Sequence, residues 1–198
     1  IYNLFTVPIL KRVFQPSDNQ NFVSVLIPAR NEEKNIEKCI KGILAQDYQD
    51  KEIIVLDDNS TDSTYNLVSS FSTSNVKVLK GKQLPPDWLG KNWACHQLAQ
   101  EAKGEYLLFI DADVELKPEV ISSAVCELEK SNVSLLSIFP TQIIKSFGEH
   151  LIVPLMNWLL LTFLPLRFVY SCSSKAFVAA NGQFMLWRKD DYFKIGGH

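Results

Sequence analysis

The sequence predicts an α/β protein with a mostly parallel sheet and helices on both of its faces. Short, apolar, β-branched segments alternate with segments of helical periodicity along most of the chain. This alternation is typical of parallel strands, which need long crossover connections and usually receive helical ones. Polar residues follow several of the expected strands, and in such sheets ligands bind outside the carboxyl ends of the strands.

The expected elements follow one another in a regular order. We expect strands at residues 23–27, 52–56, 76–79, 106–110, 133–139 and 176–187, the last with a break at Gly182. Helical spacing of apolar residues predicts helices at residues 33–46, 61–71, 91–102, 118–129 and 190–195. Pro28 should end the first strand, because proline cannot donate to a central ladder, and Asn31 should cap the first helix.

Composition limits the class of protein. The chain has 198 residues, of which 46% are hydrophobic and 21% charged, as in a globular domain that buries its own core. Its 20 basic and 22 acidic residues leave no positive surplus for a nucleic-acid partner. The 4 cysteines form no CxxC pair, which disfavours a zinc or redox motif, and we expect reduced, mostly buried thiols.

Two apolar segments predict contact with a membrane surface. Residues 1–10 are largely apolar and precede Lys11 and Arg12, as at the cytoplasmic end of a membrane helix, so residues 1–20 are interpreted as an N-terminal flank. Residues 151–170 are apolar but contain two prolines. They predict a helix in the membrane interface or one lining an apolar acceptor groove, with a buried core helix as the alternative.

Polar segments follow the first two expected strands, and adjacent strands would bring them together. The first is residues 28–32 (PARNE) and the second residues 57–62 (DDNSTD). The neighbouring carboxylates of Asp57 and Asp58 repel each other unless something binds them, so we favour ligand contact there. For Asn59 and Ser60 we favour turn formation and helix capping.

A third acidic segment and two cations complete the candidate site. Asp111 and Asp113 follow the strand at residues 106–110, and period-two geometry would point both toward the same rim as Asp57. Carboxylate oxygens suit Mg²⁺ or Mn²⁺, which complete their shells with water and phosphate. Lys91, near a helix start, either assists a phosphate or is simply solvated, and Arg30 either clamps a phosphate or pairs with Glu32 or Glu33.

Together these motifs resemble the family 2 glycosyltransferases, inverting enzymes of the GT-A fold. The matching segments are residues 25–32 (VLIPARNE), 54–62 (IVLDDNSTD), 108–113 (LFIDAD) and 181–197, which runs from NGQF to a Gly-Gly pair. Residues 88–95 (WLGKNWAC) and the apolar segment after Glu149 are similar to the membrane-associated branch with hopanoid and carotenoid glycosyltransferases. The resemblance makes residues 21–198 a GT-A catalytic domain, with a Rossmann-like nucleotide-binding sheet, truncated at its C-terminal end.

The resemblance implies roles for individual residues. Those implied to bind the donor nucleotide are Pro28, Ala29, Arg30, Glu32, Asp57, Asp58, Lys91, Asp111 and Ala112. Asp113, with Asp111, is implied to hold Mn²⁺ or Mg²⁺ on the diphosphate, and Gly182 and Gln183 to border the acceptor. The general base is expected in an acidic motif beyond His198, so we expect this piece to bind donor weakly and transfer little.

The expected function is inverting, metal-dependent transfer of a sugar from a nucleotide sugar, such as a UDP-sugar, to a hydroxyl or carboxyl of a lipid-like acceptor. It would take place at the cytoplasmic face of the cell membrane, with no nucleic acid involved. Two alternatives remain open. A nucleotidyltransferase would carry a glycine-rich loop near the first strand, where residues 28–32 have no glycine. A noncatalytic nucleotide-sugar-binding or scaffold domain would keep the fold alone.

Overall fold

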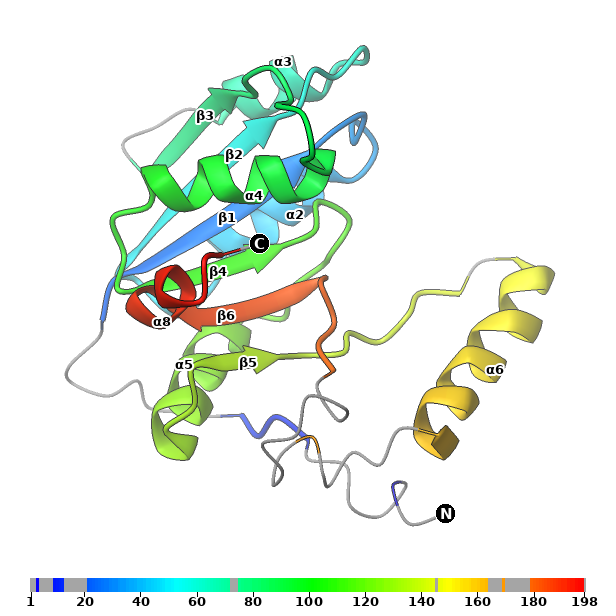
Figure 1. Ribbon diagram of the computed structural model, residues 1–198. Helices are drawn as coiled ribbons and strands as arrows, with labels where there is room; N and C mark the ends of the chain where they lie inside the picture. Colours follow the sequence, from blue (N-terminus) through cyan, green and yellow to red (C-terminus); the bar gives the residue numbers. More distant parts are fainter. Residues whose placement is uncertain are drawn as a thin grey trace. The chain divides into compact units, whose positions relative to one another are not determined.

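The computed structural model describes residues 3, 9–12, 21–71, 75–144, 146–163, 169 and 179–197 (Figure 1). The chain forms two compact units. One, here called the sheet unit, comprises Lys11–Ile138 and Asn181–His198. The other, the α6 unit, comprises Ile1–Leu10 and Phe139–Ala180. All predicted site residues belong to the sheet unit.

A six-stranded sheet with strand order β3-β2-β1-β4-β6-β5 forms the sheet unit. Its strands are β1 (Val23–Ala29), β2 (Lys51–Asp57), β3 (Val76–Lys80), β4 (Tyr106–Ile110), β5 (Leu135–Ser137) and β6 (Phe184–Arg188). β1 pairs in parallel with β2 and β4, and β2 with β3, whereas β6 is antiparallel to β4 and β5. The prediction of a mostly parallel sheet is confirmed.

Helices cover both faces of this sheet. They are α2 (Ile36–Leu44), α3 (Thr64–Ser70), α4 (Gly90–Glu101), α5 (Val120–Ser131) and α8 (Lys189–Lys194). Alternate side chains of β1 enter different cores: Val25 and Ile27 pack in the cluster with α2 and α5, and Leu26 in the cluster with α4 and α8. Figure 1 shows α4 and α8 in front of the sheet and α2 behind it.

The order of strands places the polar segments at one edge. The chain builds β2 and β3 on one side of β1 and then places β4 on the other, so the topology switches direction between β1 and β4. Ala29 lies opposite Asp57 in the β1–β2 register, and Leu26 opposite Phe109 in the β1–β4 register. A switch point at the carboxyl ends of strands is where ligands bind in open α/β sheets.

Pro28 lies inside β1, so the expectation that it ends the strand is wrong. The Ala29 carbonyl accepts from the Asp58 amide at 2.8 Å, on the β2 side. Because successive residues of a strand direct their hydrogen bonds to opposite neighbours, Pro28 faces the β4 side. There the ladder has already stopped at Leu26 and Phe109, so no partner requires the missing N–H.

Helix starts also differ from the predictions. Asn31 does not cap α2, which begins at Ile36 after Asn35, and the side chain of Asn35 makes no capping hydrogen bond either. α3 begins at Thr64, later than the predicted residue 61. The side chains that could have capped these helices are instead used in hydrogen bonds between the two loops that precede the helices. At the far side of the sheet, β5 has only 3 residues, fewer than predicted.

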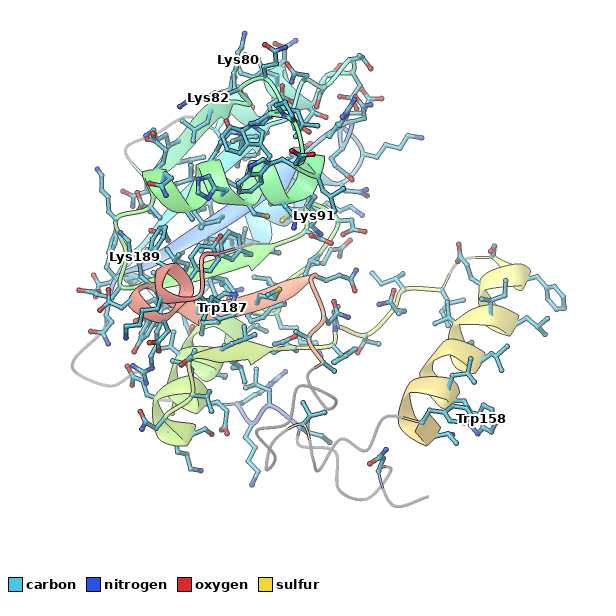
Figure 2. The ribbon with its side chains drawn as sticks, in the orientation of Figure 1. Lys80, Lys82, Lys91, Trp158, Trp187 and Lys189 are labelled. Carbon is cyan, nitrogen blue, oxygen red and sulfur yellow. The ribbon has the colours of Figure 1, made fainter. Side chains whose placement is uncertain are left out.

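The α6 unit contains the helix α6 (Phe147–Phe163), which has 17 residues and Pro154 in its interior. Apolar side chains along α6 are exposed: Phe147, Leu151, Ile152, Leu155, Trp158, Leu159 and Phe163. Figure 2 shows Trp158 near one end of this helix. In the part of the chain that the structure describes, no helix has the length and apolar character to span a bilayer. Most of residues 1–8 and 164–178, on which the membrane predictions also rested, lie outside that part.

Candidate functional site

A cavity of about 220 Å³ lies at the switch point. Its lining comes from β1, α4, β4 and β6 and consists of Pro28, Lys91, Asn92, Cys95, Phe109, Ile110, Asp111, Gly182 and Met185. Four of these, Pro28, Lys91, Asp111 and Gly182, are among the residues predicted from the sequence. Figure 2 shows Lys91 on α4 near this edge of the sheet.

The sequence predictions missed the apolar part of the lining. Cys95 and Met185 line the cavity, yet both belong to regular elements whose apolar residues also pack in the core. Asn92, next to Lys91, was likewise not singled out. Their only signal in the sequence is proximity to the WLGKNWAC and NGQF segments, which does not reveal which side chains face inward.

Lys91 and Asp111 close one side of the cavity. The Lys91 Nζ lies 2.5 Å from Asp111 Oδ1, so Lys91 forms an ion pair and is not simply solvated. Lys91 stands in the first turn of α4, where backbone N–H groups favour anions. A Cβ placed on Gly182 would lie 3.9 Å from the same Nζ, so the segment before β6 passes next to this cation.

Asp111 and Asp113 do not continue the strand. β4 ends at Ile110, and Asp111 starts a turn in which its carbonyl accepts from the Val114 amide at 3.1 Å. The period-two argument for these two carboxylates is therefore wrong. Asp111 N–H donates to the Gln183 carbonyl at 3.2 Å and so joins the end of β4 to the segment before β6. Asp113 is exposed.

The acidic residues of this turn affect the pKa of the buried Cys39 thiol. Burial, the largest cause, together with the negative charges of Asp113, Asp111 and Glu32, raises the pKa of the Cys39 thiol to about 12. Among the described residues, only Asp111 of these three carboxylates has an ion-pair partner. The turn after β4 therefore carries negative charge that a cation would neutralise.

On the other side of β1, Asp57 is buried, with 6% of its surface exposed. Its Oδ1 is buried and has no hydrogen-bond partner within the described residues. A buried acceptor without a partner is uncommon, because desolvating it costs about 1–3 kcal/mol. Within the part of the chain that the structure describes, this oxygen therefore keeps an unused acceptor site.

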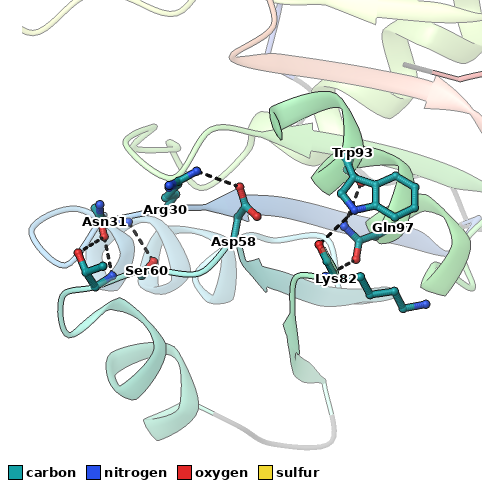
Figure 3. Close-up of polar contacts among 8 residues, drawn as sticks. Arg30, Asn31, Asp58, Ser60, Lys82, Trp93 and Gln97 are labelled. Carbon is teal, nitrogen blue, oxygen red and sulfur yellow. Dashed lines mark hydrogen bonds and ion pairs between the residues drawn. The ribbon is translucent and has the colours of Figure 1, made fainter. Parts of the chain in front are cut away.

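Asp58 pairs with Arg30, at 3.7 Å between Oδ2 and the guanidinium, as Figure 3 shows. Pairing of Arg30 with Glu32 or Glu33 was the alternative expectation, and it is wrong. Gly81 lies against Asp58, because a Cβ there would come within 3.1 Å of Asp58 Oδ1. Gly90 lies near the other carboxylate oxygen, at 3.8 Å for its added Cβ.

The loop between β3 and α4 is attached to α4 by two hydrogen bonds (Figure 3). Gln97 Oε1 accepts from the Lys82 amide at 2.9 Å, and Trp93 Nε1 donates to the Lys82 carbonyl at 3.2 Å. The rings of Trp88, Trp93 and His96 contact one another, with centroids 5.0–5.6 Å apart. These contacts hold the loop that carries Gly81 at one end and leads to Gly90 at the other.

The remaining predicted residues contribute mainly backbone. The side chains of Ala29 and Ala112 are buried in the core, and Glu32 is half-buried, with a carboxylate that accepts from Asn35 Nδ2 at 2.9 Å. Because β1 lies between β2 and β4, the strand ends that lead to Asp57 and to Asp111 are two strand spacings apart, about 10 Å. No cluster of three or more metal-ligating side chains occurs among the described residues. A cation would need ligand atoms from a bound substrate.

An open, mostly parallel α/β sheet with a cavity at its switch point and acidic loops at its carboxyl ends has the architecture expected of the GT-A fold. Residues 24–189 match the model of the family Glycosyl transferase family 2. The chain belongs to this family.

Two similar relatives within this family are carotenoid-modifying enzymes by name. The chain is 33% identical over 178 residues to a 4,4'-diaponeurosporenoate glycosyltransferase from Staphylococcus haemolyticus, covering 89% of the chain and 46% of the relative. A protein of the same name from Staphylococcus aureus is 31% identical over 91% of the chain and 47% of its own length. The chain thus spans about half the length of these relatives. The predicted similarity to carotenoid glycosyltransferases is confirmed.

Solved structures confirm the fold. A mannosyltransferase from Pyrobaculum calidifontis, in complex with GDP-Man and Mn²⁺, has a TM-score of 0.68 at 20% identity, covering 99% of the chain and 52% of that structure. TarS from S. aureus, in complex with UDP-GlcNAc, has a TM-score of 0.58 at 19% identity, covering 88% of the chain and 47% of that structure. The predicted GT-A architecture is correct.

Proposed function

We propose that this chain is the donor-binding domain of an inverting glycosyltransferase that moves a sugar from a nucleotide sugar to an apolar acceptor. The observation that carries the proposal is the buried Oδ1 of Asp57 at the carboxyl edge of the sheet, which has no hydrogen-bond partner among the described residues. A nucleobase N–H or a ribose hydroxyl is the kind of donor that this oxygen would accept from. Asp58 and Arg30, next to it, would border the same nucleoside.

The diphosphate would lie across the end of β1, between Asp57 and the turn after β4. Lys91, at the first turn of α4, would contact a phosphate oxygen, since both its charge and the helix start favour anions. It is already held beside the cavity by Asp111. The spacing of about 10 Å between the end of β2, which leads to Asp57, and the end of β4, which leads to Asp111, suits a nucleoside diphosphate better than a single shared ion.

The donor set also fits a divalent cation. Asp113, assisted by Asp111, would hold Mn²⁺ or Mg²⁺, ions that often use one or two carboxylates together with substrate phosphates. When bound, the cation would neutralise the charge that develops on the departing nucleoside diphosphate. The unbalanced negative charge around Cys39 supports this placement. The solved mannosyltransferase has Mn²⁺ and GDP-Man, which is consistent with it.

The acceptor would approach from the side of Gly182 and Gln183. Its hydroxyl or carboxyl oxygen would attack the anomeric carbon opposite the diphosphate, which inverts the configuration. Because Gly182 has no side chain, it leaves space next to Lys91 for the acceptor. The names of the curated relatives specify diaponeurosporenoate, an apolar carboxylate, as their substrate. We extend this substrate class, with a UDP-sugar as donor, to the present chain.

Apolar acceptors of this kind dissolve in membranes, so we place the reaction at the cytoplasmic face of the cell membrane. The exposed apolar side chains of α6 support this placement. A helix that presents apolar groups to the surroundings can bury them at the lipid interface. The 20 basic and 22 acidic residues give no general attraction to anionic lipid, so apolar contact would dominate.

Calorimetry with UDP-glucose, UDP-GlcNAc and GDP-mannose, with and without Mn²⁺, tests the proposal. We expect at least one donor to bind in a metal-dependent manner, and Asp113→Ala to weaken that binding about tenfold or more, which is at least about 1.4 kcal/mol. Asp190→Ala is the matched control, because Asp190 is also exposed but stands on α8. Unchanged binding by Asp113→Ala would refute the metal assignment, and no binding of any donor by the wild type would refute the function.

A further inference from the structure

We propose that Asn31 is a positioning residue, which joins the loops after β1 and β2 and thereby holds Arg30 opposite Asp58. This inference rests on the proposed function, because it concerns the nucleoside end of the donor site. Asn31 is not among the residues for which the family resemblance implied a role.

Asn31 makes hydrogen bonds in both directions across the two loops (Figure 3). Its Oδ1 accepts from the Thr61 amide at 2.8 Å and from Thr61 Oγ1 at 3.3 Å. The backbone N–H of Asn31 donates to Ser60 Oγ at 3.0 Å. The backbone of Asn31 has a φ of 56°, in the left-handed region, which asparagine adopts more readily than most residues.

Further bonds extend the connection away from the ion pair. The Glu32 amide donates to Thr64 Oγ1 at 2.8 Å, the Glu33 amide to Asp62 Oδ2 at 3.2 Å, and the Ser63 amide to Glu33 Oε2 at 3.1 Å. The two loops therefore form one hydrogen-bonded unit. Within it, Asn31 makes the bonds closest in sequence to Arg30, and these bonds end on the residues that soon follow Asp58.

The sheet itself does not determine where Arg30 and Asp58 meet. The β1–β2 register ends at Ala29 and Asp57, and the last bond of this ladder runs from the Asp58 amide to the Ala29 carbonyl. The Arg30 side chain is 66% exposed, so packing does not fix its guanidinium. Past the ladder, the hydrogen bonds of Asn31 are the next ones in sequence that connect the loop after β1 with the loop after β2. Its loss would let the Arg30–Asp58 pair drift relative to the buried Asp57.

Asn31→Gly separates this role from backbone strain. Glycine tolerates a positive φ, so the substitution removes the Oδ1 acceptor without forcing a new conformation. We expect the Kd for UDP or GDP, measured with Mn²⁺, to rise about tenfold, because two hydrogen bonds between the loops are lost. Asn31→Asp retains an acceptor oxygen and should bind within about threefold of the wild type. Ser60→Ala removes the reciprocal bond and should raise Kd about threefold.

Asn132→Gly is the matched control. Asn132 has a φ of 48° at the end of α5. The carbonyl of the next residue, Val133, accepts from Arg188 Nε. Arg188 lies opposite Tyr106 in the β4–β6 register, at the amino end of β4. The same chemical change therefore takes place at the opposite edge of the sheet. We expect its Kd to equal that of the wild type, whatever its effect on Tm.

The outcomes separate the two proposals. If the wild type binds neither nucleotide, the proposed function fails, and the role of Asn31 fails with it. If the wild type binds and Asn31→Gly binds equally well, only the positioning role is overturned, even if the Tm of this variant falls. If Asn31→Gly does not fold, Ser60→Ala decides: a raised Kd supports the role, and an unchanged Kd overturns it.

Discussion

At the scale of single residues, we propose that Asp57 serves binding at the expense of stability. Its buried Oδ1 lacks a partner among the described residues, although most buried acceptors in proteins have one. The neighbouring Asp58 is balanced by Arg30, whereas Asp57 is enclosed by the end of β2. A buried carboxylate oxygen without a partner destabilises the free protein, and the proposed nucleotide would remove this cost by donating a hydrogen bond to it.

Asp57→Ala should therefore leave the free energy of unfolding unchanged or increase it, while the Kd for nucleotide rises about tenfold or more. Chemical denaturation and calorimetry measure the two effects. Asp47→Ala is the control, because one oxygen of Asp47 is also buried with no partner among the residues described, and its other oxygen accepts from Ser122 Oγ at 3.0 Å. That variant should bind nucleotide normally. A large loss of stability in Asp57→Ala, with binding intact, would contradict the assignment.

Among the elements, the contact between β1 and the start of β4 sets the switch point. Gly104, just before β4, donates its amide to Ser24 Oγ at 2.8 Å, and Ser24 Oγ donates to Glu52 at 2.6 Å. A Cβ on Gly104 would lie 2.5 Å from the Phe22 carbonyl oxygen and 2.6 Å from the Ser24 nitrogen. Both are backbone atoms, which cannot rotate away.

We expect Gly104→Ala to destabilise the protein by about 3 kcal/mol, as overpacking in a close-packed interior commonly does. Urea denaturation followed by circular dichroism measures this change. The control is Gly148→Ala in α6, where nothing lies within 4 Å of the added Cβ. That substitution should be neutral or stabilising by up to about 1 kcal/mol, because alanine favours helices. Equal midpoints for both variants would show that β1 and β4 do not approach each other this closely.

At the scale of the whole molecule, we propose different roles for the sheet unit and the α6 unit. The sheet unit holds the cavity and its charged residues. The α6 unit presents exposed leucines, phenylalanines and Trp158 on a single helix. Because large exposed apolar patches are uncommon on soluble monomers, we propose that this helix contacts an apolar phase.

Binding to phosphatidylcholine vesicles tests this contact. Leu151 and Leu155 are 69% and 53% exposed and stand on the same side of α6, four residues apart. Changing both to glutamate should lower vesicle partitioning about tenfold or more in a flotation assay, because burial of one leucine contributes about 1.5–3 kcal/mol. Leu44→Glu, at an exposed position of α2, should partition like the wild type. The membrane proposal fails if the double variant also partitions like the wild type.

Local patterns predicted much of the fold. The strand at residues 106–110 was predicted in full, because a continuous apolar run is typical of a strand buried on both faces. Loop and helix boundaries were predicted less well. Asn31 has the character of a helix cap, yet its partner is Thr61, on the next loop. No local pattern indicates a hydrogen bond between residues that far apart.

By itself, the sequence determined the alternation of strands and helices, the polar strand ends and the family, because periodicity and motif spacing are properties of neighbouring residues. Tertiary structure decided which charges pair: Arg30 with Asp58, and Lys91 with Asp111. It also decided that Asp57 is buried with one oxygen lacking a partner in the described part of the chain, and that the chain turns after Ile110. These features depend on strand order and register, which bring together groups that are distant along the chain.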